Sequence, residues 1–283
     1  MNRHCLCFIS ALTLTAGLFA QDPKVQLPKL SPTVTLKQNV GLTDIDLVYS
    51  RPGVKGREIF GKMIPFGSVW RTGANESTKI TFSTPVKLNG TEIPAGAYAL
   101  YTIPGEHEWT IIVYKDTSLW GAYGYDQKND LVRIPATAVK LADPVETFTI
   151  DINDIRTESA TLNLIWEKTR VPVKLEFEAI NKALAQIEAA LATAGQKSGG
   201  FYYNALEFCI MNGVALQKAV AWADQGIAQN PKSGWVIYEK ACLLAKLGDK
   251  PGAIAAAKLS CAADPSDDGL AKTNEALIAS LNK

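Results

Sequence analysis

The residues best suited to bind or transform a ligand lie in one long segment, residues 49–76, between two predicted strands. The segment is rich in glycine and carries three arginines and a polar cluster near its end. Arginine presents a rigid fork of donors that suits carboxylate, phosphate or sulfate, and a nearby tryptophan stacks on sugars or apolar ligands. Long irregular connections often carry function. We therefore predict a ligand site formed by Arg51, Arg57, Trp70, Arg71, Thr72, Asn75 and Glu76, with Trp120 from farther along the chain.

The same residues allow two other interpretations. Glu76 would pair with Arg71 or Arg57 in a polar clamp, because irregular backbone near a core must find internal hydrogen bonds. Alternatively, Glu76 would serve as the acid of a hydrolase, with Arg71 and Arg57 stabilising an anion. That chemistry needs the three groups to converge in a pocket and the acid to be unpaired. Residue types alone leave the ligand site, the clamp and the hydrolase open.

Other chemistry is excluded by what the sequence lacks. Beyond residue 20 the only histidine is His107, which lies in a turn-like stretch. Zinc sites with HExxH spacing and metal clusters built on histidines are therefore excluded, and a serine–histidine hydrolase lacks its G-x-S-x-G turn. No glycine-rich phosphate loop with its lysine is present. We predict no metal and no cofactor, and we assign no catalytic residue.

The N-terminus has the pattern of a secretory signal peptide at residues 1–20. Arg3 supplies the positive charge, an apolar stretch follows from Cys5, and Ala20 provides a small residue before the predicted cleavage site at Gln21. The apolar run of roughly 15 residues is shorter than the ~20 that a spanning helix needs. We expect an exported protein, periplasmic or extracellular, without membrane insertion.

Charge and cysteine content narrow the partners further. Without Arg3, the 29 lysines and arginines fall to 28 and equal the 28 aspartates and glutamates, which argues against nucleic acid as a partner. Three cysteines remain after residue 20: Cys209, Cys242 and Cys261. Free thiols packed as small apolar side chains are one interpretation, and a bridge between Cys242 and Cys261 is the alternative.

These candidate residues belong to a predicted β-sandwich domain at residues 21–175. From Val34 to about Phe177, apolar and polar residues alternate with a period of two, which is typical of strands with one buried face. Residues 109–114 are apolar on both faces and predict a central strand. Asn89-Gly90 predicts a two-residue hairpin turn, in which both positions must tolerate positive φ. No long helical period interrupts, which favours an antiparallel sandwich.

The period changes after Pro172, and residues 176–283 form a predicted helical domain. Ala219, Ala223, Gly226 and Pro231 are matched 34 positions later by Ala253, Ala257, Ser260 and Pro265, which is the tetratricopeptide period. We predict two tetratricopeptide-like helix hairpins flanked by capping helices. The six expected helices are residues 176–194, 201–212, 215–229, 234–247, 251–263 and 269–281.

Several runs resemble a secreted bacterial family of unknown function, DUF2911. They are Tyr-Ser-Arg-Pro-x-x-Lys-Gly-Arg-x-Ile-Phe-Gly at 49–61, Pro-Phe-Gly-x-Val-Trp-Arg-Thr-Gly-Ala-Asn-Glu at 65–76, Ile-Pro-Ala-Gly-x-Tyr-x-Leu at 93–100 and Trp-Gly at 120–121. The resemblance covers about residues 31–174. It implies an exported β-domain, often followed by helical repeats, and brings no established activity, cofactor or catalytic residue.

We therefore predict an exported, non-catalytic ligand-binding or protein-scaffolding protein of the cell envelope. Its β-domain would hold a small polar ligand or glycan near the segment from Arg51 to Glu76, and its helices would present a surface to a protein or peptide. A hydrolase using the same segment and a purely structural envelope protein are the alternatives.

Overall fold

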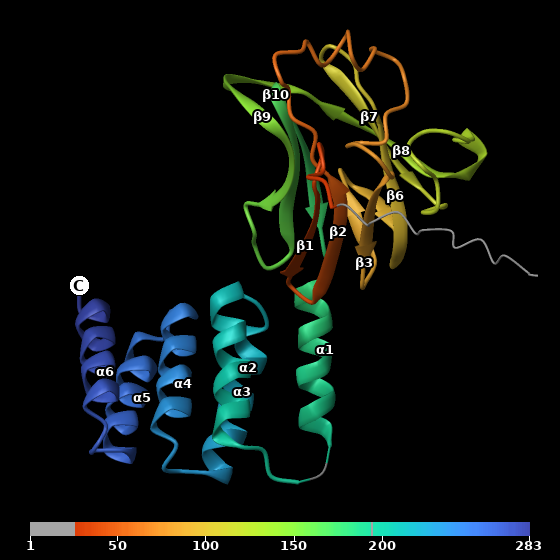
Figure 1. Ribbon diagram of the computed structural model, residues 1–283. Coiled ribbons are helices and arrows are strands. Elements are labelled where there is room, and N and C mark those ends of the chain that lie inside the picture. Colours follow the sequence, from red (N-terminus) through yellow and green to blue (C-terminus); the bar gives the residue numbers. More distant parts are fainter. Residues whose placement is uncertain (1–25, 194) are drawn as a thin grey trace, which may run out of the picture. The chain divides into compact units, whose positions relative to one another are not determined.

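The chain folds into an all-β part followed by a helical part, as seen in a computed structural model that describes residues 26–193 and 195–283 (Figure 1). Two antiparallel sheets come first along the chain, and six α-helices follow. This confirms the predicted order of a β region and an α region. The predicted signal peptide at residues 1–20 lies outside the described residues.

The larger sheet has six strands in the order β1-β2-β3-β6-β7-β8, and every neighbouring pair is antiparallel. In β2 the alternation seen in the sequence is realised, because Ile45 and Leu47 are fully buried while Asp44 is exposed. The strands are β1 (Thr33–Val40), β2 (Thr43–Ser50), β3 (Thr78–Phe82), β6 (Gly96–Ile103), β7 (Glu108–Tyr114) and β8 (Asp130–Thr137).

The smaller sheet has four strands in the order β5-β4-β10-β9. The β4–β5 hairpin turns at Asn89 and Gly90, whose φ angles of 45° and 82° confirm the predicted two-residue turn. The Asn89 side chain accepts a hydrogen bond from the Lys174 N–H at 2.8 Å, which fixes the hairpin against β10. The strands are β4 (Val86–Leu88), β5 (Thr91–Ile93), β9 (Val139–Asn153) and β10 (Ser159–Glu176).

The inner faces of the two sheets share one apolar core. Trp166 of β10 stacks on Trp70 with ring centroids 5.8 Å apart. Strand β7 is buried on both sides: Ile111 and Val113 belong to this core, whereas Ile112 and Tyr114 pack in a second cluster. This confirms the prediction of a central strand covered on both faces.

The six helices follow the predicted pattern closely. They are α1 (Ala179–Ala192), α2 (Gly199–Asn212), α3 (Leu216–Gln229), α4 (Gly234–Lys246), α5 (Lys250–Ala263) and α6 (Asp268–Leu281). Helix α1 begins three residues later than predicted because Glu176 is still part of β10, where it pairs with Lys87 of β4. Within residues 26–193 and 195–283, no helix combines the length and apolar character needed to span a membrane.

Small residues lie where the helices approach one another. Gly226 of α3 contacts the ring of Tyr202 on α2 so closely that an added Cβ would lie 2.7 Å from it. The Ser260 hydroxyl of α5 donates to the Gly234 carbonyl of α4 at 2.8 Å. Both Gly226 and Ser260 are positions at which the sequence repeat places small residues. The tetratricopeptide character of the array stays a prediction.

Candidate functional site

Trp70 belongs to the core of the β-domain. Its side chain is 6% exposed, and its ring is surrounded by Phe60, Trp109, Phe148 and Trp166. The indole N–H donates to the Gly73 carbonyl at 3.0 Å, so its polar atom is satisfied internally. The ring is therefore part of the packing between the sheets, and the structure gives it no free face for stacking on a ligand.

Thr72 and Asn75 both adopt the left-handed backbone conformation, with φ angles of 55° and 61°. Thr72 is completely buried, and its hydroxyl donates to the Thr102 hydroxyl at 3.1 Å. The Asn75 amide donates to the Ser50 hydroxyl at 3.2 Å, which links it to β2. Positive φ is uncommon for residues with a Cβ, and here internal hydrogen bonds hold it in place.

Arg51 covers the open edge of the smaller sheet. Strand β9 is the last strand of that sheet, so one row of its backbone groups has no neighbouring strand. The Arg51 Nε donates to the Phe148 carbonyl at 3.0 Å, and its Nη2 donates to the Thr149 hydroxyl at 2.7 Å. The Phe148 N–H donates to the Pro52 carbonyl at 2.9 Å. The segment that begins with Arg51 therefore protects the edge of β9.

Arg57 and Glu76 each interact with residues only three or four positions away in the chain. The Arg57 guanidinium donates to the carbonyls of Gly53 and Val54, at 2.6 and 3.0 Å. Glu76 forms an ion pair with Lys79 at 3.0 Å, with side chains 60% and 40% exposed. Exposed pairs of this kind contribute little to stability. The acceptors of the arginines in this segment are thus carbonyl and hydroxyl oxygens, and Glu76 takes a lysine as its partner.

Arg71 lies against the connection that carries Trp120. Its Nη1 donates to the Asn75 carbonyl at 3.0 Å, and a Cβ added to Gly121 would lie 2.5 Å from the same nitrogen. The Gly121 carbonyl accepts a hydrogen bond from the buried Tyr101 hydroxyl at 2.8 Å. Trp120 itself is 58% exposed. Among the predicted site residues, the structure brings Arg71 and Asn75 together beside Gly121, the neighbour of Trp120. Arg51 and Arg57 instead donate to strand β9 and to the backbone of residues 53 and 54.

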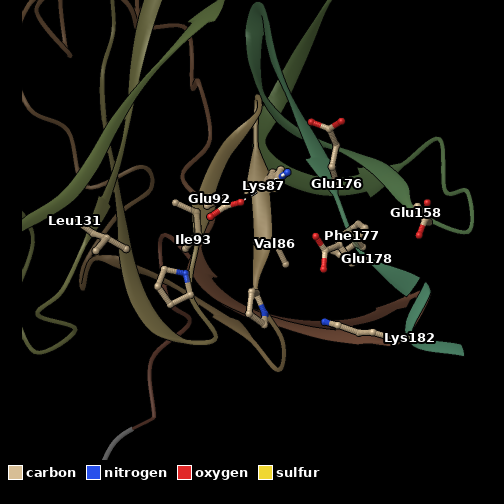
Figure 2. A pocket seen from close by; sticks show the side chains of 12 residues that line it. Val86, Lys87, Glu92, Ile93, Leu131, Glu158, Glu176, Phe177, Glu178 and Lys182 are labelled. Carbon is tan, nitrogen blue, oxygen red and sulfur yellow. Dashed lines mark ion pairs between the residues drawn. The ribbon is translucent and has the colours of Figure 1, made fainter. Parts of the chain in front are cut away.

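A groove of about 830 Å³ lies elsewhere, along the β4–β5 hairpin, the end of β10 and the first turn of α1 (Figure 2). Its accessible apolar lining comes from Pro85, Pro94 and Leu131, whereas Val86, Ile93 and Phe177 lie beneath them and are at most 6% exposed. Leu131 of β8 and Lys182 of α1 lie at opposite ends of it in Figure 2. Its volume is in the range of small-molecule sites, roughly 300–1,000 Å³.

Most of the acids that line this groove already have partners. Glu92 lies 3.7 Å from the ammonium of Lys87, and Glu176 lies 2.7 Å from that of Lys174. The Glu158 carboxylate accepts a hydrogen bond from the Ile180 N–H at 2.8 Å, at the N-terminus of α1. A carboxylate is favoured there because the first N–H groups of a helix have no partner within it.

Glu178 and Lys182 differ from the other charged residues of the groove. Glu178 is exposed and Lys182 is half-buried, and neither side chain forms a hydrogen bond or ion pair with another described residue. Glu178 precedes α1, and its side chain does not cap the helix. One carboxylate and one ammonium are therefore available to a ligand that lies on the apolar lining.

The family profile described as "Protein of unknown function (DUF2911)" matches residues 31–175, just over half of the 283-residue chain. The chain belongs to the DUF2911 family. The match spans both sheets and confirms the resemblance found in the sequence. No curated protein matches the chain significantly. The DUF2911 domain supplies the hairpin wall of the groove, whereas Glu178 and Lys182 lie beyond the matched residues.

The groove was not predicted from the sequence. Lys87 and Glu92 face each other across the β4–β5 hairpin, and opposite charges on the exposed face of a hairpin are an ordinary pattern. What creates the groove is the pairing of β4 with residues 175 and 176 at the end of β10, far away in the chain. No local signal in the sequence indicates that pairing.

The described residues offer neither a disulfide nor a cluster that could hold a metal. Cys209, Cys242 and Cys261 are free, as the first of the two interpretations predicted, and the Cys242–Cys261 bridge is not formed. Burial raises the pKa of the Cys209 thiol to about 11, so it is an unreactive thiol at neutral pH. No group of three or more histidine, cysteine or acidic side chains is arranged to hold a metal within residues 26–193 and 195–283.

Proposed function

We propose that this chain is an exported, non-catalytic binding protein of the cell envelope, and that its ligand lies in the groove beside β4, β5 and α1. The observation that carries the proposal is the unpaired side chains of Glu178 and Lys182 in a groove whose apolar lining includes Pro85, Pro94 and Leu131. The groove replaces the ligand site first predicted within residues 51–76. The arginines of that segment already donate hydrogen bonds to backbone carbonyls of the protein.

The lining defines the class of ligand. An apolar surface favours a hydrocarbon or aromatic body, while a carboxylate and an ammonium favour a polar end with both donors and acceptors. We expect an amphipathic molecule of modest size whose polar end carries both kinds of group. A glycan without an apolar part would leave the surface formed by Pro85, Pro94 and Leu131 unused.

Binding is better supported than hydrolysis. A hydrolytic site needs an unpaired acid that converges with groups able to stabilise an anion. Glu76 is paired with Lys79, and the arginines of its segment donate to carbonyl and hydroxyl oxygens. In the groove, Glu158 and Glu176 are also engaged. Glu178 is unpaired but exposed, and no arginine is among the residues that line the groove beside it.

The helical part fits a second role, the binding of a protein or peptide partner. The 34-residue repeat and the close helix contacts at Gly226 and Ser260 support a tetratricopeptide-like array. Arrays of this kind present extended surfaces to partner proteins. The chain would thus join a small-ligand domain to a scaffold for a partner.

The test is recovery of the ligand from protein purified under native conditions from its own envelope. We expect a small amphipathic compound, released on denaturation and identified by mass spectrometry, in near-equal molar amount with the chain. The double variant Glu178→Ala with Lys182→Ala should retain at least tenfold less. The matched control replaces Lys37 and Asp46, an exposed ion pair of β1 and β2.

Equal recovery from both variants, or no compound from either, would contradict the groove as the binding site. The mass of the same preparation tests export, because the mature chain should begin at or near Gln21. Retention of Met1 would contradict the signal peptide.

A further inference from the structure

Three aromatic side chains stand at nearly right angles to one another on helices α2 and α4. Tyr203 of α2 and Trp235 of α4 have ring centroids 6.4 Å apart and an interplanar angle of 87°. Trp235 and Tyr238 are 5.8 Å apart at 81°. The Trp235 indole N–H donates to Asp267 at 3.0 Å, which fixes the orientation of the middle ring.

A buried acid without a partner lies beside these rings. Glu239 of α4 is only 5% exposed, and its carboxylate forms no hydrogen bond or ion pair with any described residue; its oxygens are not among the fully buried unpaired atoms, so they still reach solvent. Glu239 follows Trp235 by four residues in α4, so the two side chains are neighbours on one face of the helix. A second acid, Glu207 of α2, lies 3.4 Å from the Tyr203 hydroxyl. We refer to Tyr203, Glu207, Trp235, Tyr238 and Glu239 as the α2–α4 cluster.

The protein supplies no cation to this cluster within the described residues. Lys240, the next residue in α4, forms its ion pair with Asp224 of α3 at 2.6 Å. A carboxylate that is largely removed from water and has no cation or hydrogen-bond donor beside it is costly. Burial, with a smaller contribution from the charge of Glu207, raises the pKa of Glu239 to about 7. At neutral pH this carboxyl group is therefore close to half protonated.

Acids and aromatic faces favour the same kind of ligand. The π face of tryptophan or tyrosine attracts a cation within about 6 Å, and a desolvated carboxylate attracts it more strongly. We propose that the α2–α4 cluster binds the side chain of a lysine or arginine presented by a partner protein. The inference rests on the proposed role of the helices as a surface for a partner, and it names the chemistry of that partner.

Binding should depend on pH. The groups that act on the ionisation of the cluster are Tyr203 and Glu207 on α2, and Glu239 and Cys242 on α4. Of the two acids, Glu239 has its pKa moved close to neutrality. A bound cation favours the ionised carboxylate, so binding should strengthen as pH rises through about 7 and should release a proton.

The experiment uses the full chain labelled with ¹⁵N at its tryptophan indoles. The probes are two blocked tripeptides, one with a central lysine and one with the neutral norleucine in its place. At pH 8 the lysine peptide should shift the Trp235 indole signal, which a Trp235→Phe variant identifies, and the norleucine peptide should not. At pH 6 the affinity for the lysine peptide should fall about tenfold.

Glu239→Gln keeps the shape of the side chain and removes its charge, so it should weaken binding of the lysine peptide at least tenfold. Glu275→Gln is the matched control, because Glu275 is an exposed acid of α6 outside the cluster. A lysine peptide that shifts other signals but not Trp235, and is insensitive to Glu239→Gln, overturns the cluster as the site while the helices remain a partner surface. Absence of any binding to the helices contradicts both.

Discussion

The hydroxyl of Tyr49 makes two hydrogen bonds with the backbone of Ile150. It donates to the Ile150 carbonyl at 3.0 Å and accepts from the Ile150 N–H at 2.8 Å. Tyr49 belongs to β2 of the larger sheet, and Ile150 belongs to β9, the edge strand of the smaller sheet. A single side chain therefore joins the two sheets and satisfies edge groups that have no neighbouring strand.

Tyr49→Phe should destabilise the β-domain. The substitution keeps the ring, which packs against Phe148, and leaves the N–H and carbonyl of Ile150 without their partner. The free energy of unfolding should fall by about 2 kcal/mol. Urea denaturation of the full chain measures it, with Tyr123→Phe as the control, since Tyr123 is 78% exposed. Equal stability of the two variants would show that water replaces the lost hydroxyl.

Arg71→Ala and Glu76→Gln should have small effects on stability. Arg71 makes one hydrogen bond to a carbonyl, and Glu76 makes an exposed ion pair. We expect losses of about 1 kcal/mol for Arg71→Ala and less for Glu76→Gln. Thermal melts measure both. A loss of several kcal/mol in each would mean that the two side chains are coupled in a clamp, and loss of a recovered ligand in Arg71→Ala would restore the original site.

Gly226→Ala should destabilise the helical part although alanine is the better helix former. An added Cβ would lie 2.7 to 3.0 Å from three atoms of the Tyr202 ring. The resulting displacement of α2 from α3 should cost about 1–3 kcal/mol, more than the gain of about 1 kcal/mol in helix propensity. Thermal unfolding followed by circular dichroism checks this. Gln225→Ala, an exposed position of the same helix, is the control and should not lower the melting temperature.

Glu239→Gln should stabilise the protein at alkaline pH. The folded state raises the pKa of Glu239 to about 7 and so binds a proton that the unfolded state releases. Stability therefore falls as pH rises from the unfolded pKa of about 4.5 to the folded pKa, and the cost persists above it. At pH 8 the variant should be more stable by about 2 kcal/mol, with little difference at pH 5. Denaturation at both pH values is the measurement, and a difference independent of pH would contradict a buried carboxylate.

The two parts should fold separately, and the best boundary lies a few residues beyond the predicted one. Residues 21–175 should give a β-type circular dichroism spectrum, and residues 176–283 should be mostly helical and marginally stable. Phe177 is 6% exposed and belongs to the core of the sandwich. A fragment that ends at residue 178 should therefore be more stable than one that ends at 175. A helical spectrum from either of the N-terminal fragments, ending at residue 175 or at residue 178, would contradict the division.

The elements of the fold were predictable because each has a local signal. Alternating residues such as Ile45 and Leu47 indicate strands, Asn89-Gly90 indicates a hairpin, and the helix periods give six helices with ends displaced by no more than a few residues. The sandwich also follows from these patterns, because strands with one apolar face must bury it against another layer.

The site residues were harder to predict, since residue type does not reveal a side chain's partner. Arg51 and Arg57 carry the groups expected of an anion site, but the nearest acceptors in the fold are carbonyl and hydroxyl oxygens. Glu239 is the opposite case: in the sequence it is one acid on an amphipathic helix, and only the packing of the helices buries it.

The place of β10 in the smaller sheet determines when the β-domain can form during synthesis. This strand, Ser159–Glu176, is made last, yet it lies between β4 and β9 and pairs with both. Until it leaves the ribosome, the β4–β5 hairpin and β9 have no common neighbour, and the inner face of the larger sheet is uncovered. A nascent chain that ends before Ser159 therefore exposes an apolar surface on which aggregation begins. The β-domain therefore cannot be completed until its last strand is available.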